Sequence, residues 1–138
     1  MTTSTDATVW WLRIALGDLR TAQSLVKIGS IPARASGQFA QQAAEKALKA
    51  AIASTGSEPT RTHDLVYLTL RCRAELQLDV TSIDVAELSA VLARSRYPIA
   101  GDPPIERDEA TRWVADAQRV VDLVARHHEI DLESLSPA

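Results

Sequence analysis

The sequence predicts an all-α fold, an up-and-down bundle of about five helices. Three observations support this fold class: five segments carry apolar residues at three- and four-residue steps, the alternation typical of strands is nearly absent, and the connections are short. The length of 138 residues suits a single domain with one core. We therefore expect one helical domain over residues 1–138, with flexible ends at residues 1–5 and 130–138.

The first two helices are separated by a glycine and a proline. We expect the first over about residues 6–28, with Thr5 or Asp6 as its cap and with Gly29 and Pro32 ending it. The second begins at about residue 32 or 36 and continues to about residue 55. The stretch "TGSEPTRT" that follows is a loop by composition.

The remaining three helices are bounded by caps and prolines. The third is expected over about residues 63–76, with Thr62 as its cap, and the fourth over about residues 81–95, where Thr81 and Asp84 resemble a capping box. The stretch "RYPIAGDPPIE" contains three prolines and a glycine, so it ends the fourth helix. The fifth is expected over about residues 106–128, since its first turn is acidic and its last is basic.

Composition excludes several classes of function. The formal net charge is −3, so nucleic-acid binding would need a local basic patch. The single cysteine, Cys72, excludes an internal disulfide, and the chain has no HExxH motif, paired CxxC motif or glycine-rich phosphate loop. We expect no metal and no cofactor. The N-terminus is a poor signal peptide and no run approaches the length that spans a bilayer, so we expect a soluble, cytoplasmic protein without membrane contact.

The second helix contains the stretch "FAQQAAEKALKAA", in which polar residues are set among alanines. At about 100° per residue, one narrow arc holds Gln38, Gln42, Glu45, Lys46 and Lys49. Small or apolar residues cover most of the remaining circumference, which is typical of a central helix with neighbours on several sides. The arc faces either a groove or the solvent. Periodicity by itself favours a solvated stripe with a Glu45–Lys49 pair.

Two further groups have one structural and one functional interpretation each. In "RTHDL", Thr62 or Asp64 could cap a helix, or His63 could transfer protons or contact phosphate in a polar cleft. In "ARSRYP", Arg94 and Arg96 suit a helix C-terminus. Alternatively, the two arginines with Tyr97 form a phosphate-binding cluster. We expect these arginines to converge on one cleft with the two lysines of the second helix.

Three segments in this order, "FAQQAAEKALKA", "THDL" and "SRYP", resemble the HEPN family, named for higher eukaryotes and prokaryotes nucleotide-binding. The resemblance extends from about Trp11 to His127. It implies an up-and-down helical bundle that pairs as a homodimer. It also implies action beside a minimal nucleotidyltransferase, often as the two parts of a toxin–antitoxin pair.

Many members of the family are metal-independent endoribonucleases with an arginine followed, after four to six residues, by a histidine. No histidine follows Arg94 or Arg96 at that spacing. The residues carried over are those of the non-RNase branch: Gln42, Glu45, Lys46, Lys49, His63, Asp64, Arg96 and Tyr97. Adding Arg94 from the basic cluster, we expect a nucleotide or RNA site there, and no catalytic residue other than the candidate His63.

Three functions are therefore open from the sequence. The first is a nucleotide- or RNA-binding accessory module. The second is an endoribonuclease in which His63 is general acid or base and Arg96 stabilises the transition state. The third is a purely structural oligomerisation domain, in which one of the adjacent Trp10 and Trp11 meets a partner chain, since both cannot face the same core.

Overall fold

The fold is an all-α bundle, as the sequence predicts. We describe residues 4–97 and 99–138 of a computed structural model. Over these residues there are no strands, and the elements are α1 (Ser4–Leu25), α2 (Ala33–Ala53), α3 (Leu65–Leu76), α4 (Val85–Arg96), α5 (Arg107–His127) and the short 3₁₀ helix η1 (Leu132–Ser134). None of the described helices is both long enough and apolar enough to cross a membrane.

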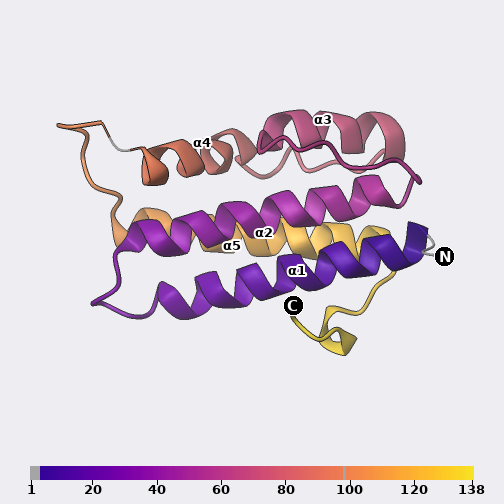
Figure 1. Ribbon diagram of the computed structural model, residues 1–138, viewed down its shortest axis with the longest axis horizontal. Coiled ribbons are helices and arrows are strands. Elements are labelled where there is room, and N and C mark those ends of the chain that lie inside the picture. Colours follow the sequence, from indigo (N-terminus) through magenta and orange to yellow (C-terminus); the bar gives the residue numbers. More distant parts are fainter. Residues whose placement is uncertain (1–3, 98) are drawn as a thin grey trace.

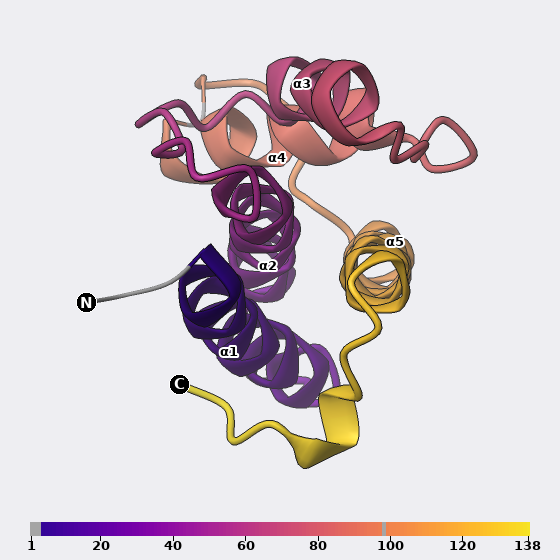
Figure 2. The same ribbon diagram turned by 90° about the vertical axis from the view of Figure 1, so that its right-hand side faces the viewer.

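Helix α2 is the central element of the bundle. It packs against each of the other four helices, most extensively against α1, with which it forms an antiparallel hairpin (Figure 1). Seen along the bundle, α2 lies between α1 and the pair formed by α3 and α4, and α5 lies to one side (Figure 2). The prediction that the alanine-rich helix is central is confirmed.

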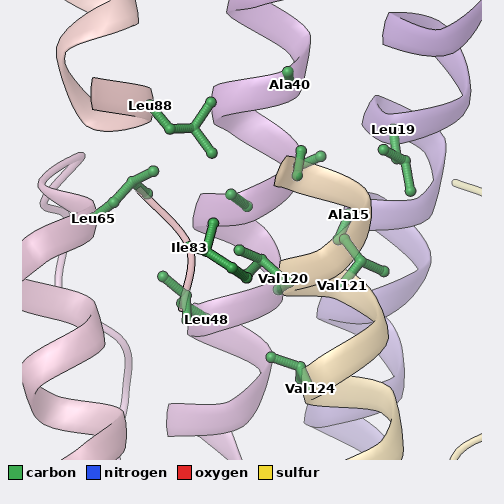
Figure 3. Packing of buried hydrophobic residues seen from close by; sticks show 14 of the residues in the cluster. Ala15, Leu19, Ala40, Leu48, Leu65, Ile83, Leu88, Val120, Val121 and Val124 are labelled. Atoms are coloured by element: carbon green, nitrogen blue, oxygen red, sulfur yellow. The ribbon is translucent and has the colours of Figure 1, made fainter. Parts of the chain in front are cut away.

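The small side chains of α2 explain its close packing. Its fully buried alanines are Ala40, Ala43, Ala44, Ala47, Ala50 and Ala51. Leucines and valines of the neighbouring helices fill the space around them (Figure 3). At Gly37 the approach is closer still, because a Cβ atom there would lie 3.2 Å from the ring of the buried Trp113. The core is therefore continuous along both sides of α2.

Helices α3 and α4 begin later than the sequence predicts, because in each case an aspartate farther along the chain is the N-cap. Helix α3 begins one residue after Asp64, whose carboxylate accepts hydrogen bonds from the backbone N–H groups of Val66 and Tyr67. Helix α4 is capped by Asp84, not by Thr81, because the Asp84 carboxylate accepts from the N–H of Glu87 at 3.0 Å. Aspartate is a strong N-cap for this reason.

The C-terminal segment packs against the bundle. Leu132 and Leu135 pack on the core, and Ala138 N donates to the carbonyl of Arg13 at 2.9 Å. A Cβ at Gly17 would overlap the backbone oxygen of Ala138, so α1 provides a notch for this segment. The expectation of a frayed tail over residues 130–138 therefore missed these contacts, which no local sequence signal reports.

Candidate functional site

Three polar residues in the middle and C-terminal part of α2 lie on a stripe that the fold buries. Gln41, Glu45 and Lys49 follow one another at four-residue spacing, so they lie on one face of the helix. Gln41 is fully buried, Glu45 is 1% exposed and Lys49 is 6% exposed. The expectation of a solvated stripe is therefore wrong here, although the expected Glu45–Lys49 pair is present.

Glu45 is the centre of this polar group. Lys49 Nζ donates to Glu45 Oε2 at 3.1 Å, and Lys46 Nζ lies 3.8 Å from the same oxygen. His63 Nδ1 lies 2.8 Å from Oε1, the other carboxylate oxygen. A buried carboxylate needs such partners, because an unpaired one would shift its pKa and lose its charge. We call Gln41, Glu45, Lys46, Lys49 and His63 the Glu45 cluster.

Gln41 ties the cluster to the loop that precedes α3. Its Nε2 lies 3.4 Å from Glu45 Oε1 and 3.3 Å from the carbonyl oxygen of His63, and both of these atoms are acceptors. The amide nitrogen must therefore face them, which fixes the orientation of the carboxamide. Its Oε1 is buried and has no hydrogen-bond partner among the described residues.

The position of His63 follows from the caps on either side of it. Thr62 Oγ1 accepts from the N–H of Asp64 at 3.0 Å, and Asp64 in turn caps α3. The capping interpretation of "RTHDL" is thus confirmed, and the histidine is held against α2 as well. His63 donates from Nδ1 to the Glu45 carboxylate, while 58% of its side chain is exposed. In the neutral ring the other nitrogen, Nε2, is then the acceptor.

Hydrogen bonds keep Glu45 ionised in spite of its burial. Burial by itself would raise the pKa of Glu45, but the hydrogen bonds from His63 and Lys49 outweigh it and lower the pKa below the usual value. Asp18 of α1 behaves in the opposite way, since burial raises its pKa more than the positive charge of Lys46 lowers it. The cluster thus holds one firmly charged carboxylate beside two lysines.

A pocket of about 560 Å³ adjoins the cluster. It lies between the first turns of α1, the end of α2 and the loop that leads to α3, and Lys49 is one of its lining residues. Trp11 lines it as well, and the ammonium groups of Lys46 and Lys49 each lie 5.9 Å from the centre of a Trp11 ring. An aromatic side chain and a cation therefore line one cavity, whose size suits a small ligand.

The loop side of this pocket adds further polar groups. Glu58, Thr60 and Arg61 line it. The Thr60 hydroxyl oxygen is buried and has no hydrogen-bond partner within the described part of the chain. Buried polar atoms are nearly always paired, so this hydroxyl is an exception among the described residues. Arg61 adds an exposed guanidinium that can bind carboxylate or phosphate with two parallel hydrogen bonds.

The basic group at the end of α4 lies elsewhere. Arg94 lines a separate pocket of about 490 Å³ with Arg34, near the start of α2. From Arg34 to Lys49 an α-helix rises roughly 22 Å. Arg94 also pairs with Glu109 at 3.2 Å and lies over the ring of Trp113. The expectation that the arginines and lysines converge on one cleft is therefore wrong within a single chain, because α4 ends beside the opposite end of α2.

The other predicted residues are distributed between these two regions. Gln42 is half-buried, and Arg96 and Tyr97 are exposed at the end of α4, where Tyr97 is 78% exposed. The sequence interpretation missed Gln41, Trp11 and Arg61 as members of a site. The four-residue spacing from Gln41 to Lys49 was a usable signal, whereas the approach of Trp11 and Arg61 depends on how α1 and the loop pack.

The structure thus defines an all-α bundle with a polar cluster buried in its central helix, next to a basic and aromatic pocket. The family model of the HEPN domain matches residues 8–128. Because this match covers most of the chain, the protein belongs to the HEPN domain family, whose members are modules of the nucleotide-binding or RNase type. Among curated proteins, none matches the chain in sequence.

Proposed function

We propose that the protein is a nucleotide- or RNA-binding accessory module. The observation that supports this function best is the pocket in which Trp11, Lys49 and Arg61 meet. An aromatic face stacks on a nucleobase without regard to its identity, and cations bind the phosphate. The Glu45 cluster holds the Lys49 side chain in place, so the pocket is preorganised on rigid helices. Arg94, Arg96 and Tyr97 lie at the end of α4, away from this pocket, and form a second basic surface.

Replacing Arg61 by glutamine is expected to weaken binding of a fluorescein-labelled hexauridylate by about 10-fold, because one charge-assisted hydrogen bond to phosphate is lost. Arg61 is exposed, so the fold is not expected to change. The measurement is fluorescence anisotropy, repeated with uridine monophosphate as competitor. The salt dependence of binding should also fall by the contribution of about one phosphate contact.

Arg73→Gln is the matched control, since Arg73 is exposed on α3 and does not line the pocket. It should bind like the wild type. If Arg61→Gln binds as tightly as the wild type and Arg73→Gln, the ligand does not occupy this pocket. If the wild type binds neither probe, the proposed binding function fails as a whole.

We further propose that the module acts as a homodimer and beside a minimal nucleotidyltransferase, in a toxin–antitoxin-type pair. Membership of the family supports this proposal. Trp10 is 53% exposed and lies edge-on to Trp11 at 5.0 Å, which suits an aromatic anchor at an interface. Sedimentation velocity of the pure chain, alone and with the product of an adjacent nucleotidyltransferase gene, tests it. A monomeric mass in both samples would contradict the proposal.

RNA cleavage without a metal is the second candidate function. The observation that favours it is the 2.8 Å contact of His63 Nδ1 with Glu45, which leaves Nε2 free to accept a proton, as in a carboxylate–histidine pair. In this chain Arg61 or Lys49 would have to stabilise the transition state, since Arg96 lies at the other end of α2. A cleavage assay on total RNA should show activity that His63→Ala removes. Equal degradation by both proteins would indicate a contaminating nuclease.

A further inference from the structure

Lys49 is paired with the Glu45 carboxylate and also lines the pocket. Its Nζ donates to Glu45 Oε2 at 3.1 Å, and the same side chain lines the pocket beside Trp11. Only 6% of Lys49 is exposed, so few water molecules can screen its charge. Any anion bound in the pocket therefore competes with Glu45 for the attraction of this one cation.

Glu45 in turn divides its charge among Lys49, Lys46 and His63. The two closest partners bind different oxygens, Lys49 at Oε2 and His63 at Oε1, and Lys46 lies farther from Oε2, at 3.8 Å. When His63 is neutral, only the two lysines balance the carboxylate, and the pocket offers little net positive charge. When His63 is protonated, the imidazolium balances Glu45, and the charge of Lys49 becomes available to an anion in the pocket.

The charged groups of the Glu45 cluster, of the pocket and next to them form the background charge against which His63 acts. On α2 they are Glu45, Lys46 and Lys49, on the loop Glu58, Arg61 and Asp64, and on α1 Asp18. With neutral His63 and all other groups in their usual ionised forms, the four carboxylates slightly outweigh the three cations. Histidine is the side chain whose ordinary titration falls between about pH 5 and pH 8. Asp18 is the one carboxylate here whose pKa burial raises, so it needs its own control.

We propose that the pocket binds an anionic ligand together with a proton, which His63 takes up and whose effect passes through Glu45 to Lys49. This inference rests on the proposed binding function and adds its regulation. Binding of a phosphate group becomes tighter as the pH falls through the titration of histidine. By reciprocity, the bound anion favours the imidazolium, so ligand binding takes up a proton from the buffer.

Protonation of His63 also affects the loop that forms one wall of the pocket. The loop carrying Thr60 and Arg61 ends at His63, and Gln41 holds the His63 carbonyl at 3.3 Å. Protonation strengthens the contact between His63 and Glu45, so it also secures this wall of the pocket. Protonation of His63 therefore raises the affinity for an anion in two ways: it frees the charge of Lys49, and it holds the loop against α2.

The experiment measures the affinity of hexauridylate at about pH 5.5 and about pH 8, a range in which its phosphodiesters and bases keep their charge while histidine titrates. Wild type is expected to bind about 10-fold more tightly at the lower pH. Isothermal titration calorimetry in two buffers of different ionisation enthalpy should show net proton uptake on binding between these two pH values.

Four variants test whether His63, and not another titratable group, takes up the proton. His63→Gln should bind weakly at both pH values and take up no proton, while His63→Lys should bind tightly at both. Asp18→Asn and His127→Gln should keep the pH dependence of the wild type, since His127 is exposed at the end of α5 and does not line the pocket. Circular dichroism melting curves verify that each variant is folded.

The outcomes are distinguishable from failure of the binding function itself. Binding of equal strength at both pH values, or a pH dependence that survives in His63→Gln, would overturn the proton coupling and leave the binding function standing. A pH dependence lost in Asp18→Asn but kept in His63→Gln would assign the proton to Asp18 and overturn it as well. Absence of any binding by wild type would overturn both proposals.

Discussion

Replacement of Glu45 by glutamine is expected to lower the free energy of unfolding by about 3–5 kcal/mol. Glu45 is 1% exposed, and its carboxylate is the acceptor for Lys49 and His63. The substitution keeps the shape of the side chain but leaves the ammonium of Lys49, itself 6% exposed, without its counter-charge. Urea unfolding followed by circular dichroism measures the change, with the slope of the transition showing whether unfolding remains two-state.

A double variant tests whether the unpaired charge is the cause. Glu45→Gln with Lys49→Met should recover more than half of the loss, because a buried pair replaced by uncharged groups of similar volume is often nearly neutral. Glu75→Gln is the matched control, since Glu75 pairs with Arg71 at 2.8 Å on the surface of α3. Such an exposed pair contributes about 0.5 kcal/mol or less. A loss in Glu45→Gln no larger than in this control would contradict the buried-charge explanation.

The pH dependence of the same variant has a definite sign. Burial would raise the pKa of Glu45, but its hydrogen bonds from His63 and Lys49 lower it below the usual value. A group with a lowered pKa contributes stability above its unfolded pKa, about 4.3 for glutamate, and loses it as the pH falls through the folded value. Wild type and Glu45→Gln should therefore converge in stability as the pH falls through the lowered folded pKa of Glu45, and should differ most at neutral pH.

Replacement of Trp113 by alanine is expected to destabilise the protein by about 3–5 kcal/mol. Trp113 is fully buried, and a Cβ at Gly37 would lie 3.2 Å from its ring, so the Trp113 ring of α5 packs tightly against the backbone of α2. Its Nε1 also donates to Glu87 Oε1 at 3.1 Å. Truncation removes the ring, leaves a cavity between the helices and frees an acceptor on α4.

Trp113→Phe and Trp10→Ala provide the comparison. Phenylalanine retains most of the ring volume and should cost clearly less than alanine. Trp10 is 53% exposed, so its truncation should change the unfolding of the chain by under about 1 kcal/mol. Urea unfolding at low protein concentration, monitored by circular dichroism, gives all three values. Equal losses for Trp113→Ala and Trp10→Ala would contradict the packing described here.

Helix α2 shows what the spacing of residues in a helix can predict and what it cannot. Alanines around most of the helix correctly predict a central element, because small side chains matter only where neighbours approach. The same pattern placed Gln42 in the polar arc with Glu45, whereas the structure buries Gln41 against it. A helical wheel gives the faces of one helix, but the neighbouring elements decide which face is covered. The burial of Glu45 and Lys49 was therefore not predictable from spacing.

The two basic groups show the second limit. Arg94 and Lys49 both lie near helix ends in the sequence, and both are suited to phosphate. They line different pockets because α4 ends beside the start of α2, while the loop before α3 returns to the end of α2. Which end a connection reaches depends on contacts between distant segments, and no motif within "ARSRYP" records them.

By itself, the sequence determined the all-α class, the order and approximate extent of the five helices, the central place of α2 and the membership of the HEPN family. It also named Glu45, Lys49 and His63 as candidates, since residue type and helical spacing are local properties. Only the tertiary structure decided that these three form one buried cluster, that Trp11 and Arg61 face a pocket beside it, and that Arg94 is elsewhere. The physical reason is that burial and cavity shape arise from the packing of segments far apart in the chain.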